Sequence, residues 1–287
     1  MPDYRTVPAN THRQFRRIRR PRRFHRTERR LPSGLLLKEY EFLSEDRKGK
    51  TLLFFTDLHL RFSLTRNLFG GGGPPFWRGS GWIASALREA TEMLHPDYLL
   101  FGGDLVTYTE CYPAAMRMMA ELRAPGGCFA VPGNWDKRRR RWLPFREIER
   151  RYEQAGWRLL VNEEVRDDAL LIYGTDDYKI GIPRVYDTRA KTGFRVLLSH
   201  NPDTVAELPE EEIGPFDLAL CGHTHGGQIR LPGFGALRAS SRYWKRFEYG
   251  FYERKGGNTA MIVSSGIGAT WIPVRIHCPP EAVLVRF

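Results

Sequence analysis

Short apolar runs separated by polar turns and amphipathic segments make up most of the chain. Runs such as TLLFFT at 51–56 have the length of a buried strand, whereas WIASALREATEMLH spaces its apolar residues as a helix does and ends before Pro96. The predicted helices are residues 82–95, 114–122 and 144–155. The predicted strands are residues 35–43, 51–56, 98–101, 128–133, 158–161, 170–173, 194–199 and 217–221, with two more in TAMIVSS and EAVLVRF.

Strands and helices alternate at first, and strands dominate later in the chain. This order predicts one layered α/β domain over residues 34–287. The four consecutive glycines and the two prolines at 70–75 predict a loop without regular structure over residues 61–81, and the absence of GK[ST] excludes a phosphate-binding P-loop. We expect either an inert insertion or a lid whose aromatic residues could cover an acyl chain.

The positive charge is concentrated at the beginning of the chain. Residues 1–33 contain eleven arginines against Asp3 and Glu28, which gives +9 of the total formal charge of +12. Few aliphatic residues accompany them, so we expect 1–33 to be an Arg-rich disordered tail. Such a tail could bind an anionic membrane surface or, nonspecifically, nucleic acid.

The four cysteines lie far apart and form no CxxC motif, which predicts buried reduced thiols. No apolar run approaches the roughly 18 residues that a membrane span requires. No apolar segment of a secretory signal follows the basic start. These features predict a cytoplasmic protein that could still act at a membrane surface.

Potential metal ligands follow five of the apolar runs, at the point where each predicted strand ends. They are Asp57, His59, Asp104, Asn134, His200, His223 and His225. One aspartate or histidine after a strand is usually a turn residue, but seven in this order are hard to explain that way. Ligands of α/β sheets gather beyond the carboxyl ends of strands, so we expect these side chains to converge.

The spacing of these residues suffices for two metal ions. Asp57 and His59 are two residues apart, as are His223 and His225, and on an extended chain each pair shares one face. Mixed carboxylate, amide and imidazole ligands suit Mn, Fe, Zn or Mg better than a thiolate site would, and the cysteines supply no competing cluster. We expect two divalent ions and favour Mn.

Five short motifs resemble those of the calcineurin-like metallophosphoesterases. They are DLH at 57–59, GGD at 102–104, GN at 133–134, SH at 199–200 and GHTH at 222–225. The longer string GHTHGGQIRLPGFG is similar to the bacterial branch of YaeI- and YkuE-type phosphodiesterases. A pyrophosphatase that splits UDP-diacylglucosamine in lipid A biosynthesis is similar to that branch too.

The resemblance implies a four-layer αββα sandwich over residues 34–287, with the Arg-rich tail outside it. It implies that Asp57, His59, Asp104 and His225 hold one metal ion. It likewise implies that Asp104, Asn134, His200 and His223 hold the other, so that Asp104 bridges the two. A metal-bridging hydroxide would then attack phosphorus, with Asp104, Asn134 and His200 as the central catalytic residues.

Trp135 departs from the family's GNH[DE] motif. The histidine of that motif is thought to protonate the leaving oxygen, whereas an indole N–H can donate a hydrogen bond but cannot deliver a proton near neutral pH. The change would remove general-acid assistance, worth typically 10²–10⁴-fold in rate. It therefore favours substrates with an acidic leaving group, unless the site has become a metal-holding scaffold or another residue supplies the proton.

Two cation-rich segments could contact an anionic substrate or surface. The run 137–141 follows Trp135, and we expect Arg138 and Arg139, with Trp135, to bind substrate, although a solvated turn is the alternative. Residues 242–255 interleave aromatic side chains with cations. They are explained either by strand and turn packing or by contact with lipid head groups.

Together these features predict a hydrolase, a dinuclear metallophosphoesterase that cleaves a phosphodiester or pyrophosphate bond. The substrate is expected to be lipid-linked, like UDP-diacylglucosamine, and the protein to lie on the inner membrane face. One alternative is a soluble phosphodiesterase or nuclease recruited to nucleic acid by the Arg-rich tail. The other is a noncatalytic metal-containing binder of membranes or nucleic acid.

Overall fold

A computed structural model describes most of the 287-residue chain. The described residues are 11–18, 24–42, 49–61, 79–138, 143–186, 193–270 and 274–287. Within these ranges, no helix is both long and apolar enough to cross a membrane. The predicted glycine-rich loop lies almost wholly outside the described residues.

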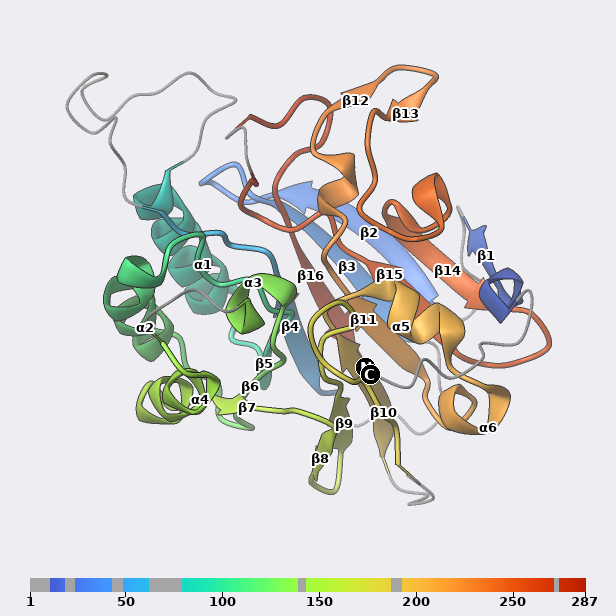
Figure 1. The fold of residues 1–287 in the computed structure, drawn as a ribbon, viewed down its shortest axis with the longest axis horizontal. Coiled ribbons are helices and arrows are strands. Elements are labelled where there is room, and N and C mark those ends of the chain that lie inside the picture. Colours follow the sequence, from blue (N-terminus) through green and yellow to red (C-terminus); the bar gives the residue numbers. More distant parts are fainter. Residues whose placement is uncertain are drawn as a thin grey trace.

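The first of two mixed seven-stranded sheets carries the amino-terminal half of the predicted strands (Figure 1). In spatial order its strands are β2 (Phe24–Arg30), β3 (Leu36–Phe42), β16 (Glu281–Arg286), β4 (Thr51–Phe55), β5 (Tyr98–Phe101), β6 (Cys128–Ala130) and β7 (Arg158–Leu159). Strands β4 to β7 are parallel, and the carboxyl-terminal β16 lies between β3 and β4, parallel to the former and antiparallel to the latter.

The second sheet contains the later strands together with one strand from the beginning of the chain. In spatial order its strands are β1 (Phe15–Ile18), β14 (Gly250–Arg254), β15 (Ala260–Val263), β11 (Leu218–Cys221), β10 (Phe194–Ser199), β9 (Leu170–Gly174) and β8 (Glu163–Arg166). The four central strands are parallel. A separate hairpin joins β12 (Arg230–Leu231) to β13 (Gly235–Ala236).

Helices cover the outer faces of both sheets. The helices are α1 (Ser80–Leu94), α2 (Tyr112–Glu121), α3 (Asn134–Lys137), α4 (Phe145–Gln154), α5 (Pro202–Glu207) and α6 (Glu210–Ile213). Helices α1, α2 and α4 pack on the first sheet, and α5 and α6 pack on the second. The arrangement is consistent with the predicted sandwich. Helix α1 ends where the sequence predicted, with His95 in a left-handed conformation (φ 43°) before Pro96.

The core forms because successive residues of a central strand point to opposite faces and both faces are covered. In β4, Leu53 and Phe55 pack toward the helices, whereas Leu52 and Phe54 pack between the sheets. The four cysteines are buried thiols, none of them in a disulfide, as the sequence predicted.

The prediction of a disordered arm is wrong for residues 15–18 and 24–30. The first segment pairs with β14 and the second with β3, and each is anchored by a buried phenylalanine, Phe15 or Phe24. Strands β1 and β2 are edge strands with one side facing solvent, and most of their arginines are exposed. Because arginines are at least as numerous as apolar residues in both segments, the sequence does not reveal that Phe15 and Phe24 are buried. Residues 1–10 and 19–23 lie outside the described residues.

Candidate dinuclear metal centre

All seven predicted ligands lie beyond the carboxyl ends of parallel strands, at one edge of the two sheets. The first sheet contributes Asp57 and His59 after β4, Asp104 after β5 and Asn134 after β6. The second sheet contributes His200 after β10 and the histidine pair after β11. The predicted convergence is therefore present, and all seven side chains are buried.

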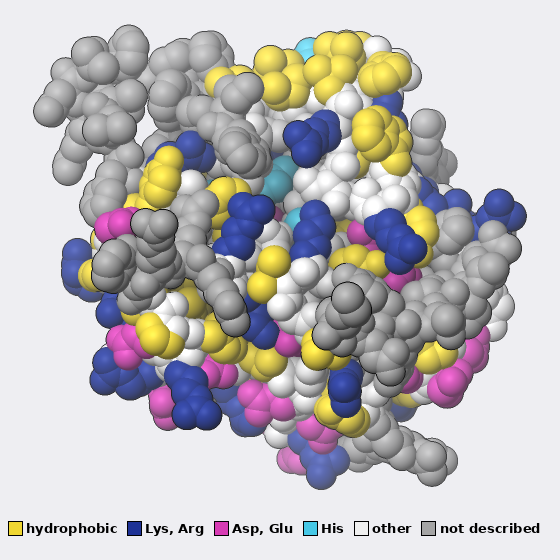
Figure 2. Space-filling view, viewed as in Figure 1, with side chains coloured by type: hydrophobic (Ala, Val, Ile, Leu, Met, Phe, Trp, Pro, Cys, Tyr) yellow, Lys and Arg dark blue, Asp and Glu magenta, His cyan; other side chains and the backbone are white. Residues whose placement is uncertain are grey.

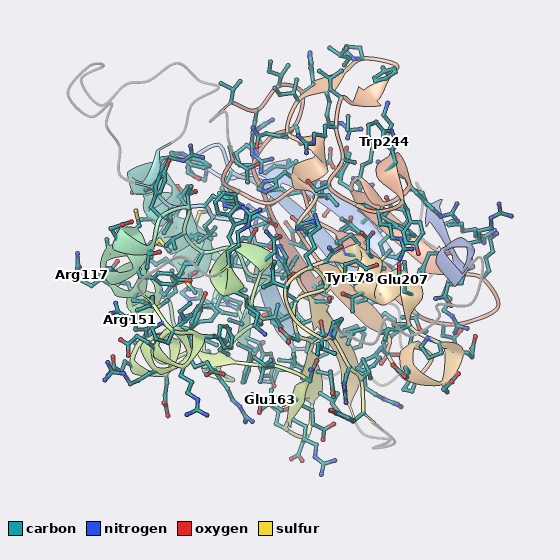
Figure 3. The ribbon with its side chains drawn as sticks, in the orientation of Figure 1. Arg117, Arg151, Glu163, Tyr178, Glu207 and Trp244 are labelled. Carbon is teal, nitrogen blue, oxygen red and sulfur yellow. The ribbon has the colours of Figure 1, made fainter. Side chains whose placement is uncertain are left out.

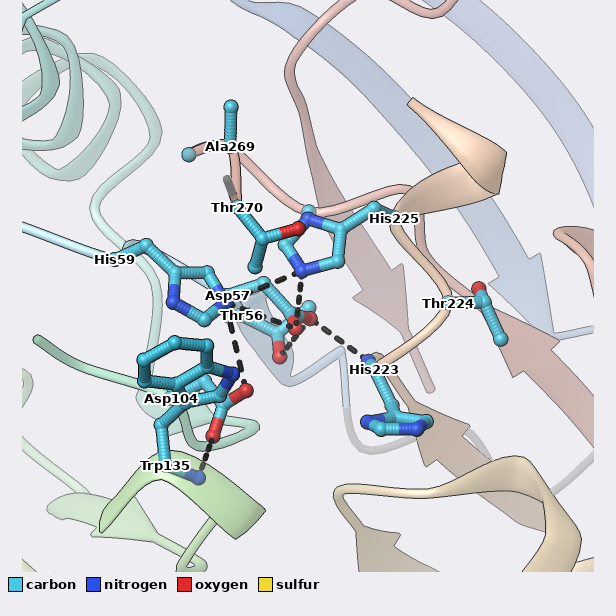
Figure 4. Close-up of polar contacts among 12 residues, drawn as sticks. Thr56, Asp57, His59, Asp104, Trp135, His223, Thr224, His225, Ala269 and Thr270 are labelled. Carbon is cyan, nitrogen blue, oxygen red and sulfur yellow. Dashed lines mark hydrogen bonds and ion pairs between the residues drawn. The ribbon is translucent and has the colours of Figure 1, made fainter. Parts of the chain in front are cut away.

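The first candidate site consists of Asp57, His59 and His225. One potential ligand atom from each lies within 4.8 Å of the others. The Nε2 atoms of the two histidines are 3.1 Å apart, and His225 Nε2 is 3.3 Å from Asp57 Oδ1 (Figure 4). Three donor atoms thus point into one small volume.

The second candidate site consists of Asp104, His200 and His223. One potential ligand atom from each of them likewise lies within 4.8 Å of the other two. His200 Nε2 is 3.1 Å from His223 Nδ1 and 3.3 Å from the side-chain oxygen of Asn134. The other ring nitrogen, His200 Nδ1, lies 2.7 Å from the carbonyl of Gly102, to which it can donate. That bond leaves Nε2 free to act as a ligand.

Asp104 stands between the two candidate sites. Its Oδ2 atom is 3.4 Å from Nε2 of His59 and 3.4 Å from Nε2 of His200. A single carboxylate oxygen therefore faces one histidine from each group, which is the place that a bridging ligand requires.

Most of the backbone that carries these side chains is strained. Five of the seven residues lie in the left-handed region, namely Asp57 (φ 56°), His59 (φ 43°), Asp104 (φ 60°), His223 (φ 69°) and His225 (φ 54°). This conformation is uncommon for residues other than glycine and costs of order 1 kcal/mol each. The surrounding fold therefore supports an arrangement of side chains that the chain alone would not prefer.

Two glycines allow the ligand loops to approach each other. A Cβ atom on Gly133 would lie 2.1 Å from Asp104 Oδ1, and one on Gly222 would lie 2.3 Å from Asp57 Oδ2. Both distances are impossible for real atoms, so these positions of GN and GHTH accept only glycine.

Burial keeps three of the four histidines neutral. It lowers the pKa of His59 to about 4 and places the pKa values of His223 and His225 well below the ordinary value. Burial also opposes the charged form of His200, but Asp104 outweighs it and raises the pKa of His200 to about 10. Neutral imidazoles with free lone pairs are the form that binds metal ions, so at His200 a cation would have to replace the proton that Asp104 stabilises.

The donor set fits divalent cations. Asp57 Oδ1 is a buried carboxylate oxygen that accepts no hydrogen bond, and burial raises the pKa of Asp57 to about 6. An acceptor left in this state is costly unless a cation satisfies it. Carboxylate, amide and imidazole donors together suit first-row divalent ions or Mg²⁺.

The model of the calcineurin-like phosphoesterase family matches residues 50–227, which contain all seven of these residues. The chain therefore belongs to the calcineurin-like phosphoesterases. Family membership confirms the prediction of a hydrolase acting on phosphoester bonds and explains the paired metal sites. The role of each side chain in metal binding or catalysis stays a prediction.

Curated bacterial proteins of this family are similar to the chain. An uncharacterized metallophosphoesterase of Aquifex aeolicus is 30% identical over 216 residues, which cover 69% of this chain and 76% of that protein. The uncharacterized metallophosphoesterase YkuE of Bacillus subtilis is 29% identical, with 65% of this chain and 66% of YkuE covered. Phosphodiesterase YaeI of Escherichia coli is 26% identical, with 88% and 87% covered.

Asp136 organises the centre of this phosphoesterase, a role that the sequence analysis did not assign. Its Oδ2 accepts hydrogen bonds from the backbone N–H groups of Gly133 (2.9 Å) and Asp104 (2.8 Å). Its Oδ1 accepts from the Tyr112 hydroxyl (2.9 Å) and from the N–H of Leu105 (3.3 Å). Asp136 thus joins the GGD and GN loops, and its position in the GNH[DE] pattern was the available signal.

Trp135 lies directly beside the candidate metal sites. Its backbone N–H donates to Asp104 Oδ1 (2.8 Å), and its ring stands edge-on to that of His59 with centroids 5.6 Å apart. The guanidinium of Arg138 lies over the indole, 5.0 Å from the ring centroid. Trp135 and Arg138 therefore lie next to the candidate metal sites, and their binding of substrate stays a prediction; Arg139 lies outside the described residues.

Lys137, the first residue of the cation run 137–141, forms an ion pair within the protein. The partner is Asp176, and both side chains are largely buried. The Lys137 Nζ atom also lies 4.7 Å from the centroid of the Phe145 ring. Asp176 also accepts the backbone N–H groups of Asp177 and Ile182. Lys137 and Asp176 therefore fasten α3 to the loop after β9.

Proposed function

We propose that this phosphoesterase uses two divalent metal ions to cleave a bond with an acidic leaving group. The bond would be a pyrophosphate or an activated phosphodiester. The observation that supports the proposal is the place of Trp135, against Asp104 and His59, where a histidine of the family motif would otherwise stand beside the reacting group.

Each of the two groups of candidate ligands would hold one metal ion. Asp57, His59, Asp104 and His225 would hold one ion, and Asp104 with Asn134, His200 and His223 the other. Such ions supply Lewis acidity to a phosphoryl group and to the water molecule that attacks it. The mixed oxygen and imidazole donors favour Mn²⁺ without excluding Fe, Zn or Mg.

Trp135 limits what the chain itself can do for the leaving group. An indole N–H can hydrogen-bond to an oxygen but does not release its proton near neutral pH. A simple alkoxide would therefore depart slowly, whereas a phosphate departs readily because its second pKa is about 6. The bond that best matches this site is one whose leaving oxygen needs no proton.

We further propose that the substrate is lipid-linked and resembles UDP-diacylglucosamine. The similarity of the GHTHGGQIRLPGFG string to the YaeI and YkuE branch, to which the UDP-diacylglucosamine pyrophosphatase is also similar, supports this proposal. The name phosphodiesterase given to YaeI supports cleavage of a phosphodiester bond. The Arg138 guanidinium, held on the Trp135 ring, provides a permanent positive charge for a second anionic group of such a substrate.

The test compares leaving groups in wild type and Trp135→His. With Mn²⁺, wild type should hydrolyse bis(p-nitrophenyl) phosphate and a nucleoside diphosphate ester, and should leave a matched alkyl phosphodiester almost untouched. Trp135→His should raise alkyl ester cleavage by about 10²-fold and change p-nitrophenyl cleavage much less. Asp104→Ala is the inactive control.

Two outcomes would contradict the proposal. One is a wild-type enzyme that cleaves alkyl esters as fast as matched pyrophosphates, which would mean that another side chain supplies the proton. The other is a metal-loaded wild type with no more activity than Asp104→Ala toward any of these substrates.

A further inference from the structure

Five large apolar side chains lie exposed along one edge of the molecule. They are Leu231 (46% exposed), Phe234 (60%), Leu237 (47%), Trp244 (55%) and Ile276 (42%), which we call the hairpin surface. Figure 2 shows hydrophobic side chains gathered at the top of the view, where Figure 1 places β12 and β13. Exposed apolar groups that cluster in this way usually mark an interaction site.

Hydrogen bonds hold the three segments of the hairpin surface together. Ile276 forms a bridge with Ile229 and accepts the N–H of Arg230 (3.0 Å), which places it beside β12. Lys245 donates to the carbonyl of Phe234 (2.9 Å), which joins the hairpin to the segment that carries Trp244. The three segments that carry the apolar side chains therefore lie side by side.

Trp244 is held outward at an energetic cost. Its φ of 54° lies in the left-handed region, where a bulky residue is rarely found. The neighbouring residues are fixed to α5, because Asp203 accepts hydrogen bonds from the Ser241 hydroxyl and the Arg242 N–H, and Glu207 accepts one from Tyr243 (each 2.6 Å). Figure 3 shows Trp244 at the periphery, outside Glu207. Strain that exposes a tryptophan adds nothing to folding stability and therefore indicates a function.

The border of this surface is positively charged. Residues 228–247 include Arg230, Arg238, Arg242, Lys245 and Arg246 but no aspartate or glutamate. The next residue, Glu248, is buried and paired with Arg230 and with Arg17 of β1. Long basic side chains around an apolar centre can keep their charged ends in water while the neighbouring apolar side chains enter an apolar medium.

We propose that the hairpin surface docks on an anionic lipid bilayer. Leucine, isoleucine, phenylalanine and tryptophan would enter the head-group region, and exposed border cations, Arg238 foremost, would bind lipid phosphates. Arg230, Arg242 and Arg246 already contact Glu248, Glu207 and the Phe15 carbonyl, so they contribute mainly to the positive potential. Nucleic acid fits less well, because protein interfaces with it are mainly polar and Leu231, Leu237 and Ile276 can neither stack nor form hydrogen bonds. The inference adds a docking site to the lipid-linked substrate proposed above, and it stands on different residues.

The same surface borders the candidate metal centre. Strand β12 begins five residues after His225, and the Arg230 side chain donates to the carbonyl of Gly226 (2.8 Å) in the loop that carries this histidine. A protein docked through the hairpin would therefore bring the metal centre close to phosphate groups at the bilayer surface.

The test measures sedimentation of the full-length protein with vesicles of phosphatidylglycerol and phosphatidylcholine, and with phosphatidylcholine alone. The variant combines Phe234→Ser with Trp244→Asn, because asparagine tolerates the left-handed conformation. The control combines Met93→Ser with Ile182→Ser, which removes side chains of similar exposure elsewhere (49% and 50%). Thermal unfolding of both variants verifies that they are folded.

Two salt concentrations separate apolar insertion from attraction by the arginines. Raising NaCl from about 0.1 M to about 0.5 M screens charges but not apolar contacts. Wild type and control should keep a salt-resistant bound fraction on phosphatidylglycerol vesicles, whereas the variant should bind roughly tenfold more weakly at high salt. A charge variant, Arg238→Gln, should weaken binding at low salt more than Arg117→Gln on α2 does.

Several results would overturn this inference. The first is a variant that binds the vesicles as well as wild type does at both salt concentrations. The second is a wild type that does not bind anionic vesicles. The third is loss of duplex DNA binding, instead of vesicle binding, in the variant. None of these depends on hydrolysis of soluble p-nitrophenyl esters, which separately tests the proposed function.

Discussion

The backbone N–H of Trp135 donates a 2.8 Å hydrogen bond to Oδ1 of Asp104, whose other oxygen lies between the two candidate metal sites. The backbone of the unusual residue thus orients the central carboxylate, whatever side chain it carries. Because the backbone, and not the side chain, of residue 135 contacts Asp104, a tryptophan can occupy this position while the ligand arrangement stays intact. It also means that Trp135→His should change proton donation without moving Asp104.

We expect Asp136→Asn to loosen both ligand loops. The two carboxylate oxygens of Asp136 accept four hydrogen bonds, and asparagine would present an NH₂ group to two of those donors. The free energy of unfolding should fall by about 3 kcal/mol, and bound Mn²⁺ should decrease. Urea unfolding and metal analysis measure the two effects, with Glu92→Gln on the exposed face of α1 as the control. Unchanged stability would show that Asp136 does not hold the loops.

Gly222→Ala should weaken metal binding at the candidate centre. The new methyl group would lie 2.3 Å from Asp57 Oδ2, so either the carboxylate or the loop before His223 must move. We expect the bound metal to fall from two ions toward one, together with loss of hydrolysis. Gly81→Ala is the matched control, because a Cβ there meets nothing within 4 Å and alanine favours the helix. Two ions bound by Gly222→Ala would contradict the close approach of these loops.

Phe24→Ala should show that β2 belongs to the folded domain. Phe24 is 3% exposed and packs against Tyr40, Phe42 and Phe251, with ring centroids 4.9 to 6.5 Å apart. Removing the ring should lower the free energy of unfolding by about 3 kcal/mol, as measured in urea. Thr27→Ala, on the exposed side of the same strand, should have little effect. If both substitutions are neutral, the arginine-rich segment contributes nothing to the fold.

The buried ion pair between Lys38 and Glu281 predicts a pH dependence of stability. Nζ and Oε2 are 2.5 Å apart, and both side chains are almost completely buried. Burial opposes both charges, but each partner outweighs it, so the pKa of Glu281 is lowered and that of Lys38 is raised. The stabilisation is therefore complete between the unfolded-state pKa values, about 4.3 and 10.4. It is lost as the pH falls through the folded pKa of Glu281 or rises through that of Lys38.

Glu281→Gln tests this pair, because it leaves the buried Lys38 charge without its carboxylate partner, with only the Tyr249 ring 4.5 Å away. We expect about 3 kcal/mol of destabilisation at pH 7 and a smaller difference from wild type in acid, where Glu281 is protonated in both the folded and unfolded wild type. Urea unfolding of both proteins in chelator removes any contribution from bound metal. A difference that does not change with pH would exclude the ion pair as its cause.

The sequence by itself identified the candidate ligands and most of the strands that carry them. Each central strand is covered on both faces, so it appears as a continuous apolar run, and the polar residue after it marks the edge where ligands gather. Asp104, for example, is identifiable from YLLFGGD without any knowledge of its neighbours. The helices α1, α2 and α4 were equally visible, because their apolar spacing and flanking prolines are local properties.

Only the tertiary structure decided features that depend on residues far apart in the sequence. Phe15 and Phe24 are buried because β14 and β3 lie beside them, and no local pattern among the arginines reveals those partners. Asp136 matters because it joins two loops, and Trp244 is exposed because α5 holds its segment outward. Local periodicity records which face of an element is apolar, but pairing, bridging and exposure are set by contacts that form when the chain folds.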